Sequence, residues 1–360
     1  MRSGRLGALL TVPALLMGLS CATASAAPAS KIFRDWSVGC DNLRSCSAVS
    51  LPAEFGENLA FLKLTRAGGP DGVLKAEIRI RTEGGKAPLA VTMTADGAPF
   101  PTAGKRWTIQ RVDDGNADLE LSASEAETLI AAARKASRLT LTAGGRTLDI
   151  SLAGSVAALL WLDEQQGRLN TTSALIRKGP STVVPAAPAL PVVTAKPWTG
   201  PALPAPEAKA LAASLRRHLK RVDPDACEDR REGFPDADEA WALDSNLRLV
   251  SLLCSSGAYN FSSGFWLVTG SDVAKARKAE FPQLEGKPDN TLINADYAPS
   301  EGTVTYFGKA RGLGDCGSSG TYAWTGSRFV LTALSEMGEC RGILPNDWHD
   351  LFRSELKVAK

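Results

Sequence analysis

The sequence predicts a mostly β (α+β) protein: two antiparallel β-rich domains with a few short helices, joined by a proline-rich linker. Short β-rich runs alternate with turn signals on both sides of the chain's centre, and 360 residues suffice for two hydrophobic cores. Eight prolines lie between Gly179 and Pro206, a density that favours extended polyproline geometry. We therefore divide the chain into a signal peptide (1–26), an N-terminal domain (27–178), the linker (179–206) and a C-terminal domain (207–360).

The first 26 residues have the features of a signal peptide. Arg2 and Arg5 precede an uncharged apolar run, and the segment ends with small residues at Ala24-Ser25-Ala26, a site for signal peptidase. The run is shorter than the roughly 20 residues that a transmembrane helix needs. The sequence predicts a bacterial periplasmic or secreted protein without a transmembrane segment. Cys21 leaves one alternative open, a lipoprotein with an acylated N-terminal cysteine.

The charge balance argues against one class of partner. The 41 basic residues fall to 39 when Arg2 and Arg5 leave with the signal peptide, and this equals the 39 acidic residues. Binding to a phosphate backbone is driven by surplus basic charge, which a neutral chain lacks. We expect no nucleic-acid partner.

Six cysteines remain after the signal peptide, an even number that suits an oxidising compartment. Two precede the linker and four follow it, so pairing within each domain predicts three local disulfides. A structural zinc site is disfavoured, because no Cys-x-x-Cys occurs and the two histidines, His218 and His349, stand alone. The predicted pairs are Cys40 with Cys46, Cys227 with Cys254, and Cys316 with Cys340.

The N-terminal domain is predicted to be antiparallel, with Gly-Gly and Asp-Gly pairs at the hairpin turns, including Gly84-Gly85 and Asp96-Gly97. Two amphipathic helices are expected, at 124–137 with Ser122 or Ser124 as N-cap, and at 151–163. The predicted strands are 59–65, 74–81, 89–94, 107–112 and 139–141.

The C-terminal domain is predicted to open with a helix at 207–222, where leucines recur four residues apart. The acidic stretch 223–239 lacks the spacing of an EF-hand and is expected to be a solvated loop. The predicted strands are 239–244, 247–254, 264–269, 302–307, 320–324 and 328–333.

Several segments carry a family resemblance. FRDWSVGCDNLRSCSAVSL, at Phe33–Leu51, resembles the opening of the invasion-associated locus B proteins, small bacterial exported β proteins in which a tryptophan precedes a close cysteine pair. With four further segments, the chain resembles the exported family catalogued as domain of unknown function 1176 (DUF1176). The resemblance covers nearly all of the mature chain and implies export and a β-rich fold, but no activity. The four segments are Ser151–Leu175, Gly257–Asn260, Ala310–Leu331 and Cys340–Arg353.

Motifs for catalysis or cofactor binding are not convincing in this sequence. Gly312–Gly317 matches G-x-G-x-x-G, but the residues that follow indicate a strand and not the helix that would face a phosphate. No G-x-S-x-G occurs, and S-x-x-K at Ser354 lacks its companion motifs. We predict no catalytic residue, no cofactor and no metal.

The glycine-rich loop from Arg311 to Gly320 is the predicted recognition surface, held by the Cys316–Cys340 bridge. Arg311, Asp315 and Trp324 are expected to give it a cation, an acceptor and a flat apolar anchor. Two functions remain open: a non-enzymatic binding or interaction module that contacts an envelope protein or glycan, and an envelope hydrolase that acts on wall glycan or peptide through carboxylates. A deep pocket with two facing carboxylates would favour the hydrolase.

Overall fold

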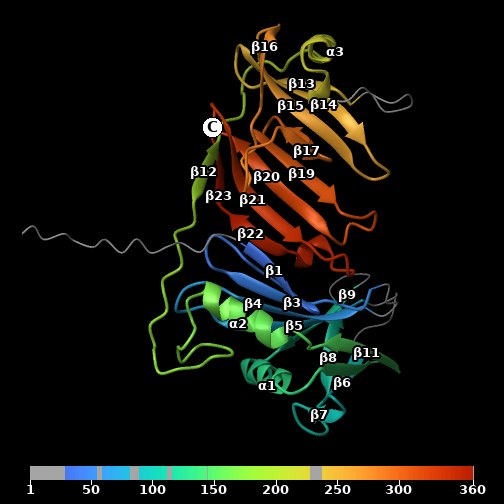
Figure 1. Cartoon of the computed structure of the whole chain (residues 1–360), viewed down its shortest axis with the longest axis vertical. Coiled ribbons are helices and arrows are strands. Elements are labelled where there is room, and N and C mark those ends of the chain that lie inside the picture. Colours follow the sequence, from blue (N-terminus) through green and yellow to red (C-terminus); the bar gives the residue numbers. More distant parts are fainter. Residues whose placement is uncertain are drawn as a thin grey trace, which may run out of the picture.

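The structure is a computed structural model that describes residues 29–54, 59–81, 89–111, 116–143, 145–227 and 237–359. The predicted signal peptide and the turn predicted at Gly84-Gly85 lie outside these residues. Strands account for 45% of the chain and helices for 15%, which confirms the predicted mostly β class. The molecule is elongated, with the N-terminal strands at one end and the C-terminal sheets at the other (Figure 1).

The N-terminal region is one antiparallel sheet of eleven described strands, in the order β1-β2-β3-β4-β5-β9-β8-β6-β10-β11, with β7 paired to β6. The strands are β1 (Ala29–Phe33), β2 (Trp36–Cys40), β3 (Cys46–Ser50), β4 (Ala60–Arg66), β5 (Leu74–Arg81), β6 (Leu89–Ala95), β7 (Ala98–Phe100), β8 (Trp107–Arg111), β9 (Asn116–Leu121), β10 (Arg138–Ala143) and β11 (Arg146–Ser151).

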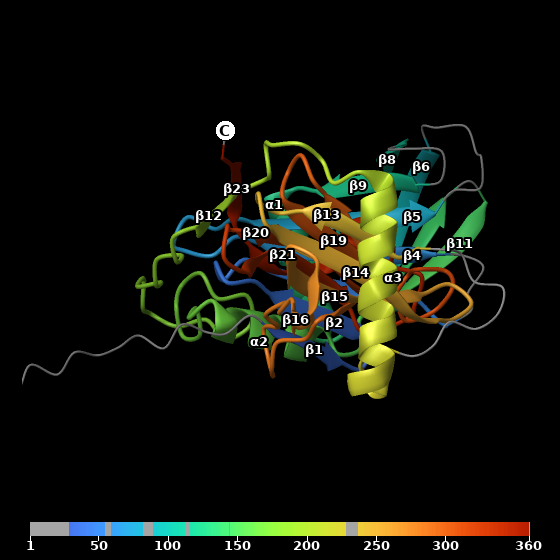
Figure 2. The same ribbon diagram turned by 90° about the horizontal axis from the view of Figure 1, so that it is seen from above.

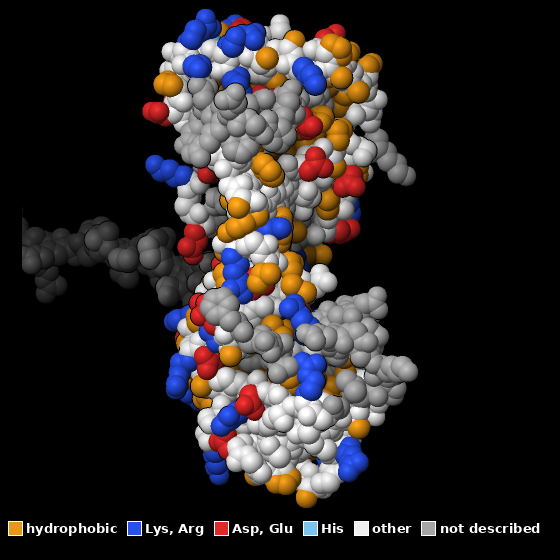
Figure 3. Space-filling view, turned by 90° about the vertical axis from the view of Figure 1, so that its right-hand side faces the viewer, with side chains coloured by type: hydrophobic (Ala, Val, Ile, Leu, Met, Phe, Trp, Pro, Cys, Tyr) orange, Lys and Arg blue, Asp and Glu red, His pale blue; other side chains and the backbone are white. Residues whose placement is uncertain are grey.

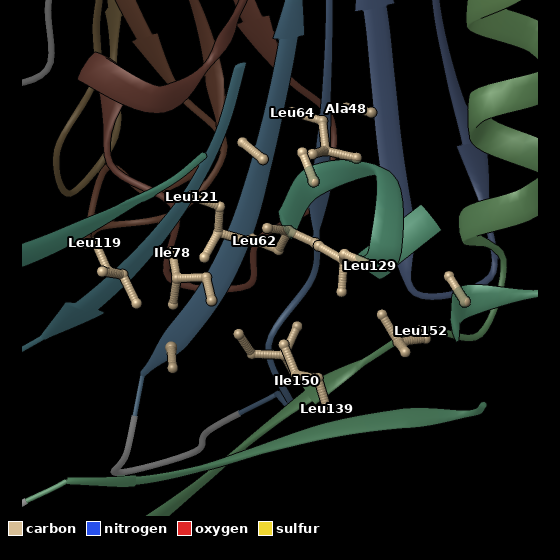
Figure 4. Close-up of a cluster of buried hydrophobic side chains, with 14 of the residues drawn as sticks. Ala48, Leu62, Leu64, Ile78, Leu119, Leu121, Leu129, Leu139, Ile150 and Leu152 are labelled. Carbon is tan, nitrogen blue, oxygen red and sulfur yellow. The ribbon is translucent and has the colours of Figure 1, made fainter. Parts of the chain in front are cut away.

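Strand β5 shows why these residues form a sheet. Its sequence LKAEIRIR alternates in character, and Ala76, Ile78 and Ile80 are buried while the residues between them are half-buried. This period of two places one face of the strand on the core. Figure 4 shows Ile78 within that core, with side chains from the neighbouring strands and from helix α1 (Ala123–Ala133) around it.

Helix α1 starts at a capping box, and its N-cap is Ser122, one of the two serines that the sequence offers. Ser122 accepts a hydrogen bond from the Glu125 amide, and the Glu125 side chain accepts one from the Ser122 amide. Leu129 and Ile130 then face the core. Helix α2 (Ser155–Gln165) begins four residues later than predicted, because Ser151 still pairs with Arg138 in the sheet and Gly154, at φ 99°, makes the turn.

The C-terminal region contains two five-stranded sheets. One has the order β13-β14-β15-β16 with β17 paired to β15, and the other runs β18-β19-β20-β21-β22. The strands are β13 (Glu239–Ala242), β14 (Leu247–Ser256), β15 (Phe261–Thr269), β16 (Asp272–Lys278), β17 (Thr291–Ile293), β18 (Asp296–Ala298), β19 (Thr303–Lys309), β20 (Gly317–Trp324), β21 (Phe329–Met337) and β22 (His349–Arg353), with short 3-10 turns at Pro224–Ala226 and Pro345–Asp347.

Helix α3 (Ala205–Val222) lies across the first of these sheets (Figure 2). Its leucines at 211, 215 and 219 pack on Val250, Leu252 and Trp266. On the other side of the sheet, Phe265 and Phe281 share a second core with side chains of β20 and β21. Within the described part of the chain, no helix combines the length and the apolar character needed to cross a bilayer.

Part of the proline-rich segment packs against the C-terminal region, whereas the sequence predicts a semi-rigid spacer that joins neither core. Residues Val192–Ala195 form strand β12, which pairs in parallel with β23 (Glu355–Val358). The Ala195 side chain is fully buried, and the Lys196 amide donates to the Trp324 carbonyl at 2.7 Å. The five residues between Pro191 and Pro197 contain no proline and include two valines and a threonine, so this stretch can join a sheet. The predicted domain boundaries stay a prediction.

The three predicted disulfides are all present: Cys40–Cys46, Cys227–Cys254 and Cys316–Cys340. Each one joins cysteines on the same side of the proline-rich segment. The pairing deduced from the position of that segment is therefore confirmed.

The two regions meet through β22, which lies against β2 and β3. His349 is fully buried there and hydrogen-bonds to Ser37 at 2.8 Å through Nε2 and to Ser47 at 2.6 Å through Nδ1. Burial, with a smaller effect of Lys63, lowers the pKa of His349 to about 3. Figure 3 views the molecule from the side that carries the ends of β14 and β19. On this side, hydrophobic side chains gather near the junction between the two regions.

Candidate functional site

Hydrogen bonds to a buried aspartate, Asp315, hold the predicted recognition loop in place. Asp315 is 1% exposed and accepts hydrogen bonds from Arg311 at 2.7 and 2.5 Å and from the Gly342 amide at 2.6 Å. Burial alone would raise the pKa of Asp315, but these hydrogen bonds outweigh it and leave the pKa below its usual value. The pair fastens the loop to the turn that carries Cys340.

Trp324 does not lie on this surface, so the prediction of an exposed anchor is wrong. Its side chain is 2% exposed and packs against Phe329, with ring centroids 5.1 Å apart. Strand β20 lies between β19 and β21 in the sheet, and its last residues face the core that the two C-terminal sheets share. Arg311 and Asp315 are therefore hydrogen-bonded to each other in the loop, whereas the Trp324 side chain packs in the core.

The glycine motif of the same loop leads into a strand, as predicted. Gly317 is the first residue of β20, at φ 134°, and a Cβ at this position would lie 2.0 Å from the Gly308 carbonyl oxygen. Only glycine fits this close approach of two strands. The segment lacks the following helix that would direct amides at a phosphate.

A different part of the molecule has the features of a binding site. A pocket of about 390 Å³ lies between helix α1, the segment 72–74 and the segment 172–178. Its walls are largely apolar, and one buried cation, Arg66, contributes to them. Ligand pockets typically measure roughly 300–1,000 Å³ and join apolar walls to a few polar groups, which is what this pocket offers.

Arg66 ends strand β4 and is 7% exposed. Its Nε donates to the Gly72 carbonyl at 3.2 Å, and its Nη2 donates to the Ser173 carbonyl at 2.7 Å. Its buried Nη1 makes no hydrogen bond to the described residues and lies 3.6 Å from Oδ1 of Asp163. The guanidinium is thus fixed in place with donor capacity left over.

Two buried arginines share one buried aspartate in this cluster. Asp163 and Arg168 are both fully buried, and Arg168 donates to the Ser173 hydroxyl at 2.8 Å and to the Gly69 carbonyl. Burial and, to a smaller extent, the charge of Arg168 lower the pKa of Arg66 to about 10, although the charge of Asp163 acts in the opposite direction. Burial also raises the pKa of Asp163. The three side chains together carry one surplus positive charge.

The end of helix α2 builds this cluster. Asp163 lies in its last turn and accepts the Leu175 and Ile176 amides at 2.8 and 3.0 Å. Gln166, just after the helix, donates to the carbonyls of Arg44, Arg66 and Ala67. Sequence reasoning missed these residues, although a run of polar residues after an apolar helix was visible at 163–168.

Further charges surround the pocket mouth. Arg134 and Lys178 line it and are exposed, and Glu127 is the acidic residue that lines it. Arg134 also donates to the Ile176 carbonyl. Within the described residues, no cluster of histidine, cysteine and carboxylate side chains could hold a metal ion.

Comparison with known proteins identifies the family. A family model described as a protein of unknown function (DUF1176) matches residues 30–355. The chain belongs to the DUF1176 family. This confirms the family predicted from the five segments of the sequence. One of them, Ser151–Leu175, supplies Asp163 and Arg168 to the pocket cluster of this DUF1176 protein.

Two similar proteins were found. The uncharacterized protein YpfG of Escherichia coli (strain K12) is 30% identical over 341 residues, which cover 90% of this DUF1176 chain and 91% of YpfG. The crystal structure of invasion associated protein B from Bartonella henselae covers 39% of this chain and 97% of its own, at 16% identity and a TM-score of 0.28.

Proposed function

We propose that this DUF1176 protein is an exported, non-enzymatic binding protein whose ligand occupies the pocket between α1 and the segment 172–178, which we name the α1 pocket. Export is supported by the signal-peptide pattern at the N-terminus and by the three disulfides. The envelope protein or glycan expected from the sequence stays a predicted partner.

One observation carries the proposal: a buried, oriented arginine lines a pocket whose walls are largely apolar and whose other charged residues are exposed. Burying a charge costs free energy unless the charge is paired, and a surplus buried charge is expensive to keep for stability alone. Such groups gather at functional sites. A ligand that enters the α1 pocket would contact the Arg66 side chain, which lines it.

A second hollow gives the hydrolase hypothesis its best location. It measures about 470 Å³, lies on another side of Arg66 and is lined by Asp41, Asp71 and Asp350. Asp41 is already occupied, since its oxygens accept the Leu43 and Ser45 amides and Arg353. Hydrolysis would therefore depend on Asp71 and Asp350. Release of soluble fragments from purified peptidoglycan, lost in Asp71→Asn, would favour this alternative.

The binding proposal is tested by blocking the pocket from its rim. Ala131 is exposed on α1 and lines the pocket, whereas Thr128 is exposed on the same helix and does not. We expect small molecules that raise the melting temperature of the wild type to lose this effect in Ala131→Trp and to keep it in Thr128→Trp. A metabolite screen in which no compound separates Ala131→Trp from the wild type would contradict the proposal.

A further inference from the structure

We propose that the α1 pocket takes a small apolar monocarboxylate, with the carboxylate on Arg66 and the apolar body along α1. This inference rests on the proposed function and specifies its ligand class. It follows from the charge of the buried cluster, the fixed geometry of Arg66, the nature of the walls and the charges at the mouth.

The charge of the cluster calls for one negative charge. Arg66 and Arg168 are buried with Asp163 as the acidic residue that interacts with both. A carboxylate would neutralise the surplus, whereas a dianion would leave the site with a surplus of the opposite sign and would lie close to Asp163. The cluster therefore favours a carboxylate over a phosphate monoester.

Arg66 is oriented before any ligand arrives. Two of its nitrogens are fixed by the carbonyls of Gly72 and Ser173, Nη1 is buried beside Asp163, and the side chain lines the pocket. Arg168 supports this arrangement, because it holds the Ser173 side chain at 2.8 Å. A fixed guanidinium binds a carboxylate at a lower entropic cost than a mobile one. Arg66 is the contact residue on this account and Arg168 a positioning residue.

The walls select an apolar body for the ligand. Ala126 and Ile130 of α1 are buried, Ala174 is buried opposite them, and Leu74 is half-buried. Val73 is 70% exposed at the edge of the same pocket. An alkyl chain or small aromatic ring would cover these side chains and gain roughly 25 cal/mol for each Å² of apolar surface removed from water.

The mouth is biased towards anions. Arg134 and Lys178 line it against Glu127, which adds one further net positive charge outside the buried cluster. Exposed charges contribute more to the rate of encounter than to affinity, and salt screens them. The selectivity for a carboxylate is therefore assigned to Arg66.

Matched ligand pairs test this inference in the wild-type protein. Octanoate is compared with octan-1-ol, and N-acetyl-leucine with its amide, by calorimetric titration. A charge-assisted hydrogen bond in a buried site predicts that each acid binds tenfold to a hundredfold more tightly than its neutral partner, on the order of its usual contribution. The pair with the larger difference identifies the source as a fatty acid or an amino-acid carboxylate. Hexyl phosphate is expected to bind more weakly than octanoate.

Variants test whether the preference for the acids comes from Arg66 and whether the ligands bind in the α1 pocket. Arg66→Lys keeps the charge but loses the planar fork, so octanoate should bind about tenfold more weakly while octan-1-ol is unchanged. Ala131→Trp should abolish binding, and Thr128→Trp should not. If Arg66→Lys does not fold, the two ligand pairs in the wild type still decide whether the α1 pocket prefers a carboxylate.

The outcomes separate the two proposals. If acids and neutral partners bind equally well and Ala131→Trp blocks both, the pocket binds ligands but the carboxylate assignment is wrong. Tighter binding of hexyl phosphate would overturn the assignment in the same way. If none of these probes binds, the monocarboxylate inference fails, and the metabolite screen decides the binding proposal separately.

Discussion

The loop at Arg311 and the α1 pocket both contain buried charges, but they balance them differently. In the loop, one arginine meets one aspartate, and the aspartate also accepts a backbone amide. In the pocket cluster, two arginines meet one aspartate, and one of these arginines, Arg66, also lines the pocket. An ion pair whose charges balance stabilises the loop, whereas a surplus positive charge beside a pocket is suited to binding an anionic ligand. Under the proposed function, the loop is structural and the α1 pocket binds the ligand.

The largest effect is expected for the aromatic residue next to the loop. Trp324→Ala should lower the free energy of unfolding by about 3–5 kcal/mol, because it removes a large side chain from the core. Denaturant unfolding measures this. Leu313, which is 75% exposed in the loop itself, is the matched position, and Leu313→Ala should change stability by less than about 0.5 kcal/mol. Equal effects would show that the loop is not as the structure describes it.

The second largest loss of stability is expected when Asp163, the aspartate shared by the two arginines of the pocket cluster, is replaced. Asp163→Asn keeps an oxygen for the Leu175 and Ile176 amides but leaves two buried arginines without a counter-charge. We expect a loss of about 3 kcal/mol. Asp149→Asn, which breaks an exposed pair with Arg138, should cost less than 1 kcal/mol, the upper end for such pairs. Octanoate should restore part of the stability of Asp163→Asn, and no restoration would weaken the surplus-charge argument.

The junction between the two regions should be sensitive to acid. The unfolded chain takes up a proton on His349 near pH 6.5, whereas the folded chain resists protonation until about pH 3. Stability due to this residue is therefore lost as pH falls, by about 2 kcal/mol between pH 7.5 and pH 5. His349→Gln should remove this part of the pH dependence. An unchanged profile in this variant would place the acid sensitivity elsewhere.

The smallest effect concerns the pH dependence of the contribution of Asp315. The folded pKa of Asp315 is lowered, so its contribution is present above its unfolded pKa and is lost as pH falls towards the folded value. Asp315→Asn should therefore cost about 1–2 kcal/mol at pH 7 and less at pH 3.

Urea unfolding of Asp315→Asn at both pH values measures this difference. A cost that stays constant or grows on acidification would contradict the role of the Arg311 pair in lowering the pKa of Asp315.

Local patterns in the sequence were enough to predict much of the fold. The predicted strand 74–81 has the same bounds as β5, and Ser122, one of the two predicted N-cap candidates, is the N-cap of α1. The disulfides followed from the position of the proline-rich segment. Strands such as β22 were missed because their partners lie far away in the chain: His349 pairs with Glu336 and contacts Ser37.

The candidate site was harder to predict, because its character depends on tertiary contacts. Arg66 at the end of a strand has no special sequence context, and its burial comes from α2 and the segment 172–178 folding over it. Trp324 was misassigned for the related reason that a strand end before a turn can face either solvent or a second sheet. Nothing in the local sequence showed that the second sheet lies there.

The most direct test of the account is a crystal structure of the protein soaked with octanoate. We expect a carboxylate oxygen within hydrogen-bonding distance of the Arg66 guanidinium, with the alkyl chain against Ile130. A pocket that holds only ordered water between Arg66 and Asp163, with octanoate absent or bound elsewhere on the molecule, would contradict the central claim.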